Sequence, residues 1–369
     1  SDRALELTGE ALEILQQRPG EATERIADVL AIRGQALRGL GQWERAVDAL
    51  REAQALARVA AGDGGSRLLA RTANNLGTTL FYAGRIDEAI PAMEYALRQW
   101  RDLGLADTSD ALTVMTNLAS LSQRQGDLDQ AERLYQEAIE RRERRFGASG
   151  ALGAAYLNFG SLLALRYRID ESRQSVLRGI DLITRFEGEA TISHARGVLA
   201  LGRVLMTAGD WERAGEQINR AAEMFSALVG EQHLYTEISR LQQARLLARS
   251  EPIRARARIG RVIEALREMQ PASDAYLADA WCALARLEID QGQGQAALQA
   301  AGQCAELRRE RFPDDSWMRA EARAIEAAAR VLLGQTQARE QLRDARTAMA
   351  RSLGEGHPDL RWCDRQLNG

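Results

Sequence analysis

The sequence predicts an all-α fold, a right-handed α-solenoid of about eight helix hairpins with a further helix at each end. Three observations lead to this prediction. The composition, with 45% hydrophobic residues, 5% aromatic residues and six prolines, favours helices over strands. A short turn segment recurs along the whole chain, and small residues flank it at fixed distances.

The recurring segment marks the turn inside each hairpin. It reads Gly41-Gln-Trp-Glu-Arg-Ala near the N-terminus and returns in similar form from Gly84, Gly126 and Gly209. Extending the spacing of 41 to 43 residues places the turns at Gly41, Gly84, Gly126, Tyr167, Gly209, Ser250, Gly292 and Gly334. A period of this length indicates a repeat protein.

Small residues recur seven positions before each predicted turn and five positions after it. Examples are Gly34, Gly77, Gly160 and Gly202 before the turns, and Ala46, Ala89, Ala131 and Ala214 after them. Two antiparallel helices approach closely only where side chains are short, so these residues predict helix A before the turn and helix B after it. In the last pair Ala338, Leu342 and Ala345 fit better than the regular positions, which predicts a register shifted by one residue.

We expect one superhelix over residues 1–369. Its helix pairs are expected at residues 21–61, 66–104, 108–147, 150–187, 190–230, 233–270, 274–312 and 315–354. Residues 357–369 are expected to form a C-terminal cap. Residues 1–18 fit helix B of a partial repeat, which excising a domain from a longer protein would leave; the alternative is a natural capping helix.

The pattern resembles the tetratricopeptide repeat (TPR), whose helix A carries a Leu-Gly or Leu-Ala pair and whose helix B carries a second alanine. Here the pairs are Leu76-Gly77, Leu118-Ala119 and Leu201-Gly202, and the alanines include Ala53, Ala96, Ala138 and Ala221. The unit of about 42 residues and the connector Leu353-Gly-Glu-Gly-His357-Pro358 are similar to the kinesin-light-chain-like subgroup. HEAT and armadillo repeats lack this glycine turn, and the strands of WD40 repeats are absent.

Charge and composition exclude several classes of function. The formal net charge is -3 and every one of the 49 basic residues is arginine, so no basic field is available for nucleic acid. No apolar run is long enough for a membrane span. Three cysteines and three histidines are too few and too scattered for a disulfide framework or a zinc site: Cys282, Cys304, Cys363, His194, His233 and His357. We expect a cytoplasmic protein with no metal and no cofactor.

Helix A lines the concave wall of such a solenoid, and we expect the wall at thirteen, ten, six and three residues before each turn. Repeats four to six place apolar side chains beside arginines there, which suits an acidic peptide with apolar anchors because arginine holds a carboxylate with two hydrogen bonds. The alternative is that arginine, the only cation of the chain, occurs on any helical surface. The expected contacts are Asn74, Asn75, Thr78, Phe81, Asn117, Leu157, Asn158, Arg196, Leu199, Arg203, Met206 and Arg240.

Three of these residues form a predicted asparagine ladder, because Asn75, Asn117 and Asn158 each lie nine residues before a turn. An amide both donates and accepts hydrogen bonds, so such a row can bind the backbone of an extended peptide, as the resemblance to kinesin-light-chain-like repeats implies. The alternative is that each amide binds a neighbouring helix. The chaperone-binding TPR clamp needs lysines, which this chain lacks, so the tails of Hsp70 and Hsp90 are disfavoured as partners.

The predicted function is a non-catalytic module that binds a protein or peptide. No nucleophile, base and oxyanion motif occur together and no phosphate loop is present, so this chain is not expected to be an enzyme. The resemblance implies the sensor or scaffold region of a larger bacterial signalling protein, with the C-terminal TPR region of a Ser/Thr kinase favoured, and the kinase domain would lie outside this chain. The alternatives are a stand-alone receptor for a signalling peptide, similar to the Rap and PlcR group, and a secretion or assembly adaptor.

Overall fold

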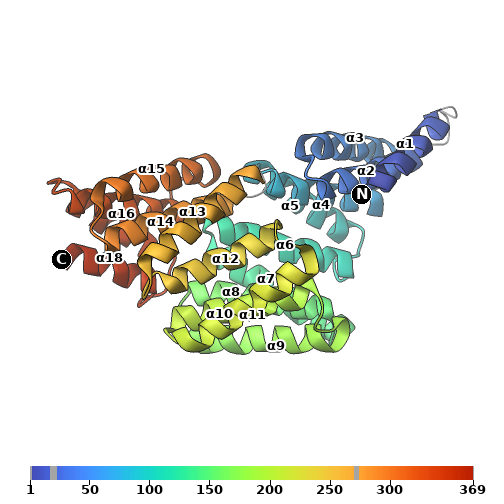
Figure 1. Ribbon diagram of the computed structural model, residues 1–369. Coiled ribbons are helices and arrows are strands. Elements are labelled where there is room, and N and C mark those ends of the chain that lie inside the picture. The colour runs from blue at the N-terminus through green and yellow to red at the C-terminus, as the bar shows by residue number, and fades with distance from the viewer. Residues whose placement is uncertain (1, 17–22, 270–273, 369) are drawn as a thin grey trace. The chain divides into compact units, whose positions relative to one another are not determined.

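The computed structural model describes residues 2–16, 23–269 and 274–368 (Figure 1). Within these residues the chain forms eighteen α-helices, one 3₁₀ segment and no strand. The predicted all-α solenoid is therefore confirmed. The predicted boundaries at residues 18, 21 and 270 lie outside the described residues.

The helices follow one another as antiparallel pairs. A first helix, α1 (Asp2–Gln16), and a last one, α18 (Pro358–Asn368), flank eight pairs. The pairs are α2 (Thr23–Gly39) with α3 (Trp43–Ala61), α4 (Arg67–Tyr82) with α5 (Ile86–Asp102), α6 (Ser109–Gln125) with α7 (Leu128–Phe146), α8 (Gly150–Leu165) with α9 (Ile169–Glu187), α10 (Ile192–Ala208) with α11 (Trp211–Val229), α12 (Leu234–Leu247) with α13 (Pro252–Glu268), α14 (Asp274–Asp290) with α15 (Gly294–Arg311), and α16 (Trp317–Leu332) with α17 (Ala338–Ala350).

Two compact units divide the chain. Unit 1 comprises Ser1–Leu121 and Glu140–Arg145, and thus holds α1 to α5 with parts of α6 and α7. Its α1 packs on the first pair, where Leu5 contacts a cluster of Leu37, Ala46 and Ala49. Unit 2 comprises Ser122–Ile139 and Phe146–Gly369, and its core runs through α8 to α18. A single superhelix over residues 1–369 stays a prediction.

The backbone explains why glycine recurs at the turns. Left-handed φ values between 57° and 100° occur at Gly41, Gly84, Gly126, Tyr167, Gly209, Gly292 and Gly334. Glycine adopts this conformation without the clash of a Cβ atom, so it ends helix A and starts the reversal into helix B. Ser250 is the predicted turn position without a positive φ.

Close contact between the helices of a pair explains the small residues before the turns. A Cβ atom added at Gly77 would lie 2.6 Å from Met93 Cγ, and one added at Gly202 would lie 2.7 Å from Ile218 Cγ1. Only glycine leaves room for the partner helix at this distance. In the last pair Ala338, Leu342 and Ala345 are buried and Arg339 is exposed, so the predicted register shift is confirmed.

Candidate functional site

The face of helix A is narrower than the sequence predicted. The position ten residues before the turn is buried in most pairs, including Leu157 at 4% exposed and Leu199 at 6% exposed. Leu157 packs with Val176 and Val204, and Leu199 packs with Phe225 and its neighbours. The expectation that both leucines serve as apolar anchors is corrected, because their side chains already fill the core between adjacent helices.

Unit 1 contributes five of the predicted contacts, all half-buried: Asn74, Asn75, Thr78, Phe81 and Asn117. The amides of Asn75 and Asn117 form no hydrogen bond with another described residue. The Oδ1 atom of Asn74 is buried and likewise has no hydrogen-bond partner there. The first two amides are therefore free to bind a ligand, and the asparagine ladder stays a prediction.

Unit 2 contributes the remaining predicted contacts. Arg196 is exposed and donates from Nη2 to Asn158 Oδ1 at 3.4 Å, so one asparagine amide is partly occupied. Arg203 is exposed and forms no ion pair with a described residue, and Met206 is half-buried against the core. Arg240 is bound to Glu231 and Glu237, which makes it less available than predicted.

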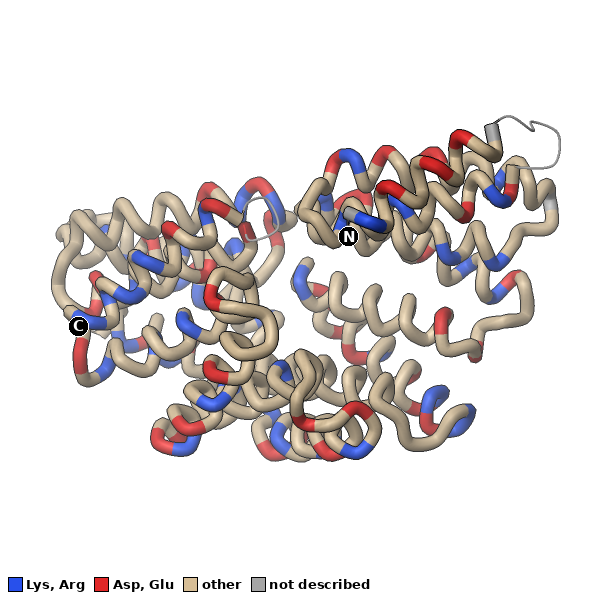
Figure 2. Tube along the Cα trace, turned by 45° about the vertical axis from the view of Figure 1, so that its right-hand side comes forward, with Lys and Arg blue, Asp and Glu red and all other residues tan. Residues whose placement is uncertain are grey.

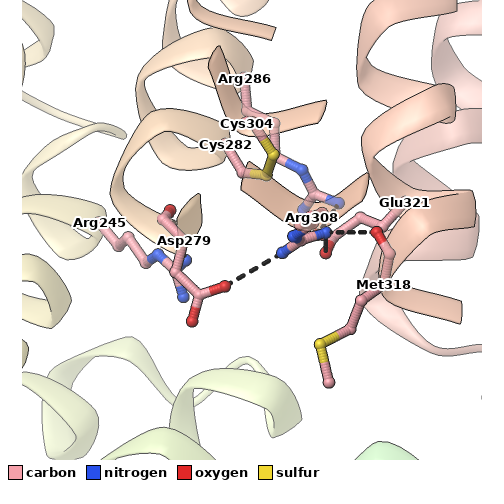
Figure 3. The surroundings of a disulfide bond; sticks show 8 residues. All are labelled: Arg245, Asp279, Cys282, Arg286, Cys304, Arg308, Met318 and Glu321. Carbon is pink, nitrogen blue, oxygen red and sulfur yellow. Dashed lines mark hydrogen bonds and ion pairs between the residues drawn. A yellow bond between two sulfur atoms is a disulfide. The ribbon is translucent and has the colours of Figure 1, made fainter. Parts of the chain in front are cut away.

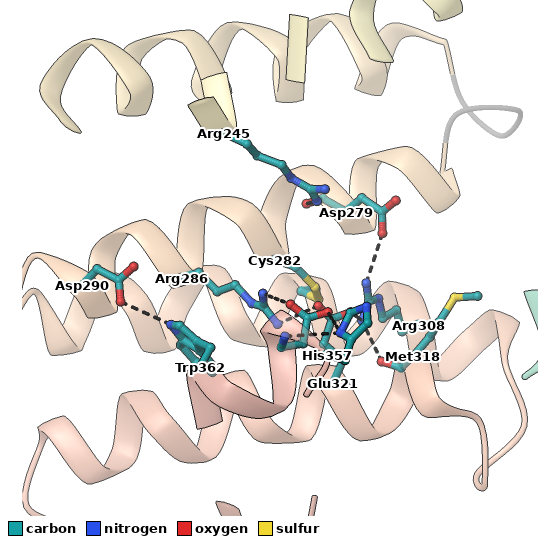
Figure 4. A network of polar contacts seen from close by, with 12 residues as sticks. Arg245, Asp279, Cys282, Arg286, Asp290, Arg308, Met318, Glu321, His357 and Trp362 are labelled. Atoms are coloured by element: carbon teal, nitrogen blue, oxygen red, sulfur yellow. Dashed lines mark hydrogen bonds and ion pairs between the residues drawn. A yellow bond between two sulfur atoms is a disulfide. The ribbon is translucent and has the colours of Figure 1, made fainter. Parts of the chain in front are cut away.

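A second polar arrangement lies in the C-terminal part of unit 2 and escaped the sequence-based list of contacts. Asp279, Arg286, Arg308, Glu321 and Asp359 form a C-terminal ion network (Figure 4). Arg308 Nη1 donates to Glu321 Oε2 at 2.5 Å and Nη2 donates to Asp279 Oδ1 at 3.0 Å. Arg286 donates to Glu321 at 2.9 Å and to Asp359 at 2.5 Å. The network thus joins α14, α15, α16 and α18.

The charges of this network stabilise one another. Burial alone would raise the pKa of Asp359, but the charge of Arg286 and the neighbouring His357 outweigh it and lower this pKa to about 2. Burial also opposes the charged form of Arg286, yet Asp359 and Glu321 raise the pKa of its guanidinium. Arg286 and Asp359 are therefore both ionised at neutral pH because each has its oppositely charged partner.

Arg245 of α12 lies beside the network in Figure 4 and is unusual for its position. Five residues before the other turns lie buried side chains, namely Ala36, Thr79, Leu121, Leu162, Val204, Leu287 and Ala329. Arg245 reaches α14 instead, where Nη2 donates to the Asp279 backbone carbonyl at 3.2 Å. Burial lowers the pKa of its guanidinium. The departure from the repeat pattern was the sequence signal that could have identified it.

Cys282 of α14 and Cys304 of α15 form a disulfide, with their Cα atoms 5.3 Å apart (Figure 3). The cysteines were expected to be too few and too scattered for a disulfide framework, and for this pair that expectation is corrected. The turn at Gly292 folds α14 and α15 against each other, so a residue ten before the turn meets one twelve after it. Cys363 is a buried free thiol, and burial raises its pKa to about 12.

Two histidines begin helices rather than bind metal. The backbone N–H of Tyr235 donates to His233 Nδ1 at 3.2 Å, and that of Asp359 donates to His357 Nδ1 at 3.3 Å. Both rings therefore act as N-caps, which explains the histidine of the connector. In the described part of the chain no group of His, Cys, Asp or Glu could hold a metal ion.

Charged residues of both signs alternate along the tube in Figure 2, with no long basic stretch. This distribution agrees with the formal net charge of -3. Among the helices described, none combines the length and apolar character that crossing a membrane requires.

The repeats of this chain match a known family of helical repeats. The sequence profile of the tetratricopeptide repeat matches residues 33–102, 68–144 and 110–185. A search of the curated proteins finds no match. The profile identifies residues 33–185 as tetratricopeptide repeats, and helix pairs joined by glycine turns continue through the later described residues, which supports a tetratricopeptide-repeat protein.

Solved structures with this fold include a Rap protein, the quorum sensor NprR and BtubC (BKLC). A Rap protein complexed with competence and sporulation factor is 12% identical, with a TM-score of 0.61 over 93% of this chain and 96% of that chain. Apo NprR from B. thuringiensis is 15% identical, with a TM-score of 0.60 over 83% of each chain. BtubC (BKLC) from P. vanneervenii is 22% identical, with a TM-score of 0.52 over 62% of this chain and 92% of that chain. These likenesses show the fold.

Proposed function

We propose that the chain is a non-catalytic module that binds a protein or an extended peptide on its helix-A face. The observation that carries the proposal is the state of Asn75 and Asn117 in unit 1. Both amides occupy the same position of consecutive repeats, are half-buried, and form no hydrogen bond with another described residue. These two amides are half-buried and still exposed in part, so a peptide backbone can replace the water that binds them.

Unit 2 contributes arginine side chains that can bind the carboxylates of a ligand. Arg196 and Arg203 are exposed on α10, and Arg203 lies three residues, about one helical turn, before the half-buried Met206. Arginines beside an apolar side chain suit a ligand that carries carboxylates and apolar anchors. The corrected apolar contact is Met206, since Leu157 and Leu199 belong to the core.

The biological setting we propose is the cytoplasmic sensor or scaffold region of a larger bacterial signalling protein, with a Ser/Thr kinase as the first candidate. A receptor for a signalling peptide has comparable support, because the Rap protein of similar fold is recorded in complex with competence and sporulation factor. A secretion or assembly adaptor is a third setting. The residues encoded upstream of Ser1 separate them: His-Arg-Asp with Asp-Phe-Gly favours the kinase, and a helix-turn-helix favours the receptor.

The binding proposal is tested with peptides selected from a random displayed library and then titrated by calorimetry. Alanine at Asn75 or Asn117 should each weaken binding by about 0.5 to 1.5 kcal/mol, with little dependence on peptide sequence, as for a neutral hydrogen bond. Alanine at Arg196 or Arg203 should matter most for peptides with Asp, Glu or a free C-terminus, and added salt should reduce the effect.

Two further variants and one control complete the test. Asn158→Ala should weaken binding, whereas Arg240→Ala should have a smaller effect because Arg240 is already paired with Glu231 and Glu237. Arg254→Ala, which removes an exposed arginine of α13, is the control. Thermal melts must match the wild type. Wild-type affinity in every variant would place the ligand elsewhere on the chain.

A further inference from the structure

A depression of about 650 Å³ lies on unit 2 between α11, α12 and α13. Trp211 and Gly215 line it from α11, Leu246 and Leu247 from the end of α12, and Arg258 from α13. Trp211 is 40% exposed, which is unusual for a tryptophan next to a TPR turn. None of the lining residues is acidic.

The depression follows from a departure of repeat six from the repeat pattern. Gln243 stands seven residues before the turn, where Gly160 and Gly202 allow helix B to approach closely. Its long side chain turns away from the partner helix, and Nε2 donates to Asn219 Oδ1 on α11 at 2.8 Å. A side chain of this length does not fit the close contact that a small residue permits at this position in the other pairs.

Gly215 leaves space at the α11 side of the depression. A Cβ atom added there would meet no atom within 4 Å, so packing inside the chain does not require glycine. Glycine in the middle of a helix costs about 1 kcal/mol relative to alanine. The open space over Gly215 is therefore available to an apolar side chain from another molecule.

Two arginines border this space without a carboxylate partner. The Arg249 guanidinium lies 4.1 Å from the centre of the Trp211 ring, a cation–π contact that holds both side chains at the rim. Arg258 is half-buried and forms no ion pair within the described residues. Burial lowers its pKa, and the charges of Arg261, Arg240 and Arg254 lower it further.

We propose that this depression is a docking site for an acidic segment of a partner protein that carries one aromatic side chain. The aromatic ring would lie over Gly215 between Trp211 and Leu246, and flanking carboxylates would bind Arg249 and Arg258. An aromatic anchor in a pocket surrounded by arginines is a common arrangement at protein interfaces. The absence of acidic lining residues selects a negatively charged partner. Of its lining residues only Leu247 stands at a position predicted for the helix-A face, and none is among the contacts named for the proposed function.

The test uses three blocked peptides that differ in one feature each: Glu-Glu-Phe-Glu-Glu, its glutamine counterpart Gln-Gln-Phe-Gln-Gln, and Glu-Glu-Ala-Glu-Glu. Binding is followed by NMR through the indole N–H of Trp211, assigned with the Trp211→Phe variant. The first peptide should bind at least about tenfold more tightly than either of the others, a difference of about 1.4 kcal/mol. Equal affinities, or no shift of the Trp211 signal at about 1 mM peptide, would overturn the proposal.

Two variants with matched controls locate the site. Gly215→Leu fills the open space and improves helix propensity, so it should fold at least as well as the wild type and lose about tenfold or more in affinity. Gly302→Leu, at a helical glycine with equally open surroundings, should retain wild-type affinity. Arg258→Gln should also lose about tenfold, whereas Arg254→Gln, which removes an arginine paired with Glu251, should not. Retained affinity in Gly215→Leu and Arg258→Gln would refute the site.

Discussion

Tyr167 occupies a turn position that is glycine in six other repeats, and its φ of 57° is left-handed. Its side chain accounts for the exception. The ring lies within 6.4 Å of the His357 ring, and Arg361 Nη2 lies 3.3 Å from the Tyr167 hydroxyl. The loop before α18 also donates from Gly354 N to the Leu165 carbonyl at 3.3 Å. The left-handed backbone of Tyr167 is unfavourable for a residue other than glycine. The contacts of its side chain with His357 and Arg361, which are far along the chain in the same unit, offset this cost.

Variants of Tyr167 separate the backbone strain from the side-chain contacts. Tyr167→Ala keeps a Cβ atom at positive φ and loses the ring, whereas Tyr167→Gly loses the ring but removes the strain. We expect Tyr167→Ala to be less stable than Tyr167→Gly by about 1 kcal/mol in denaturant unfolding. Hydrogen exchange should show faster opening of residues 354–361 in both. Equal stability of the two variants would show that the backbone is not strained.

The histidine caps predict a pH dependence. Burial lowers the pKa of His233 and His357 below the ordinary value of 6.5. The unfolded chain therefore takes up the protons first, so the stability that the neutral caps contribute is complete above about pH 6.5 and is lost as the pH falls toward the folded-state pKa values. The histidine contribution to the free energy of unfolding should therefore decrease as the pH falls below about 6.5.

The matched control for this prediction replaces both histidines by asparagine. Asparagine caps a helix through its side-chain oxygen and does not titrate. The double variant His233→Asn with His357→Asn should therefore be close to wild type in stability above about pH 7, exceed it at low pH, and show a flatter pH profile. If its profile follows that of the wild type, other groups cause the pH dependence.

At the scale of the helix pair, the glycines before the turns are the most sensitive positions. Gly77→Leu, Gly160→Leu and Gly202→Leu should each reduce stability by about 1 to 3 kcal/mol or more, because a Cβ atom would already lie 2.6 to 2.7 Å from the partner helix. Gly302→Leu is the control, since nothing lies within 4 Å of its Cβ position. Chemical denaturation measures the difference, and a loss in Gly302→Leu of the same size would contradict the packing argument.

The helix pairs could be predicted from the sequence, whereas part of the candidate site could not. Turn glycines and small residues recur because two helix backbones must meet, and this constraint is visible in the sequence. Whether a side chain of helix A faces solvent or the core depends instead on how the helices of the neighbouring pairs pack against it. Counting residues placed Leu157 and Leu199 on the open face, but each fills the gap between adjacent helices A.

Contacts that depend on distant residues also escaped the sequence. The repeat period gave the positions of Asp279, Arg286 and Glu321 but not their pairing, because Arg308 comes from a helix B and Asp359 from the last helix. The Cys282–Cys304 disulfide depends on the offset of two helices around a turn in the same way. A repeat pattern predicts elements, while partners across elements require the folded backbone.

At the scale of the whole molecule, stability should vary along the chain rather than being uniform. In a repeat solenoid each pair contacts its neighbours, so a local change is expected to act locally. The C-terminal ion network makes stability vary further along the chain. It joins four helices, α14, α15, α16 and α18, through ion pairs of mostly buried side chains. These helices should therefore open together in native-state hydrogen exchange, as one cooperative block within unit 2.

Removing one buried charge tests this cooperativity. Arg308 is 3% exposed, and Arg308→Met leaves the carboxylate of Asp279 without its ion-pair partner and Glu321 with Arg286 alone, which should cost about 1 to 3 kcal/mol. Protection should fall in residues 274–368 and stay at wild-type values in α2 to α5 of unit 1. The double variant Arg308→Met with Asp279→Asn should recover part of the loss, because it removes the carboxylate that has lost its ion-pair partner and leaves Arg286 paired with Glu321 and Asp359. A uniform loss of protection along the described chain would instead mean that the repeats unfold as a single unit.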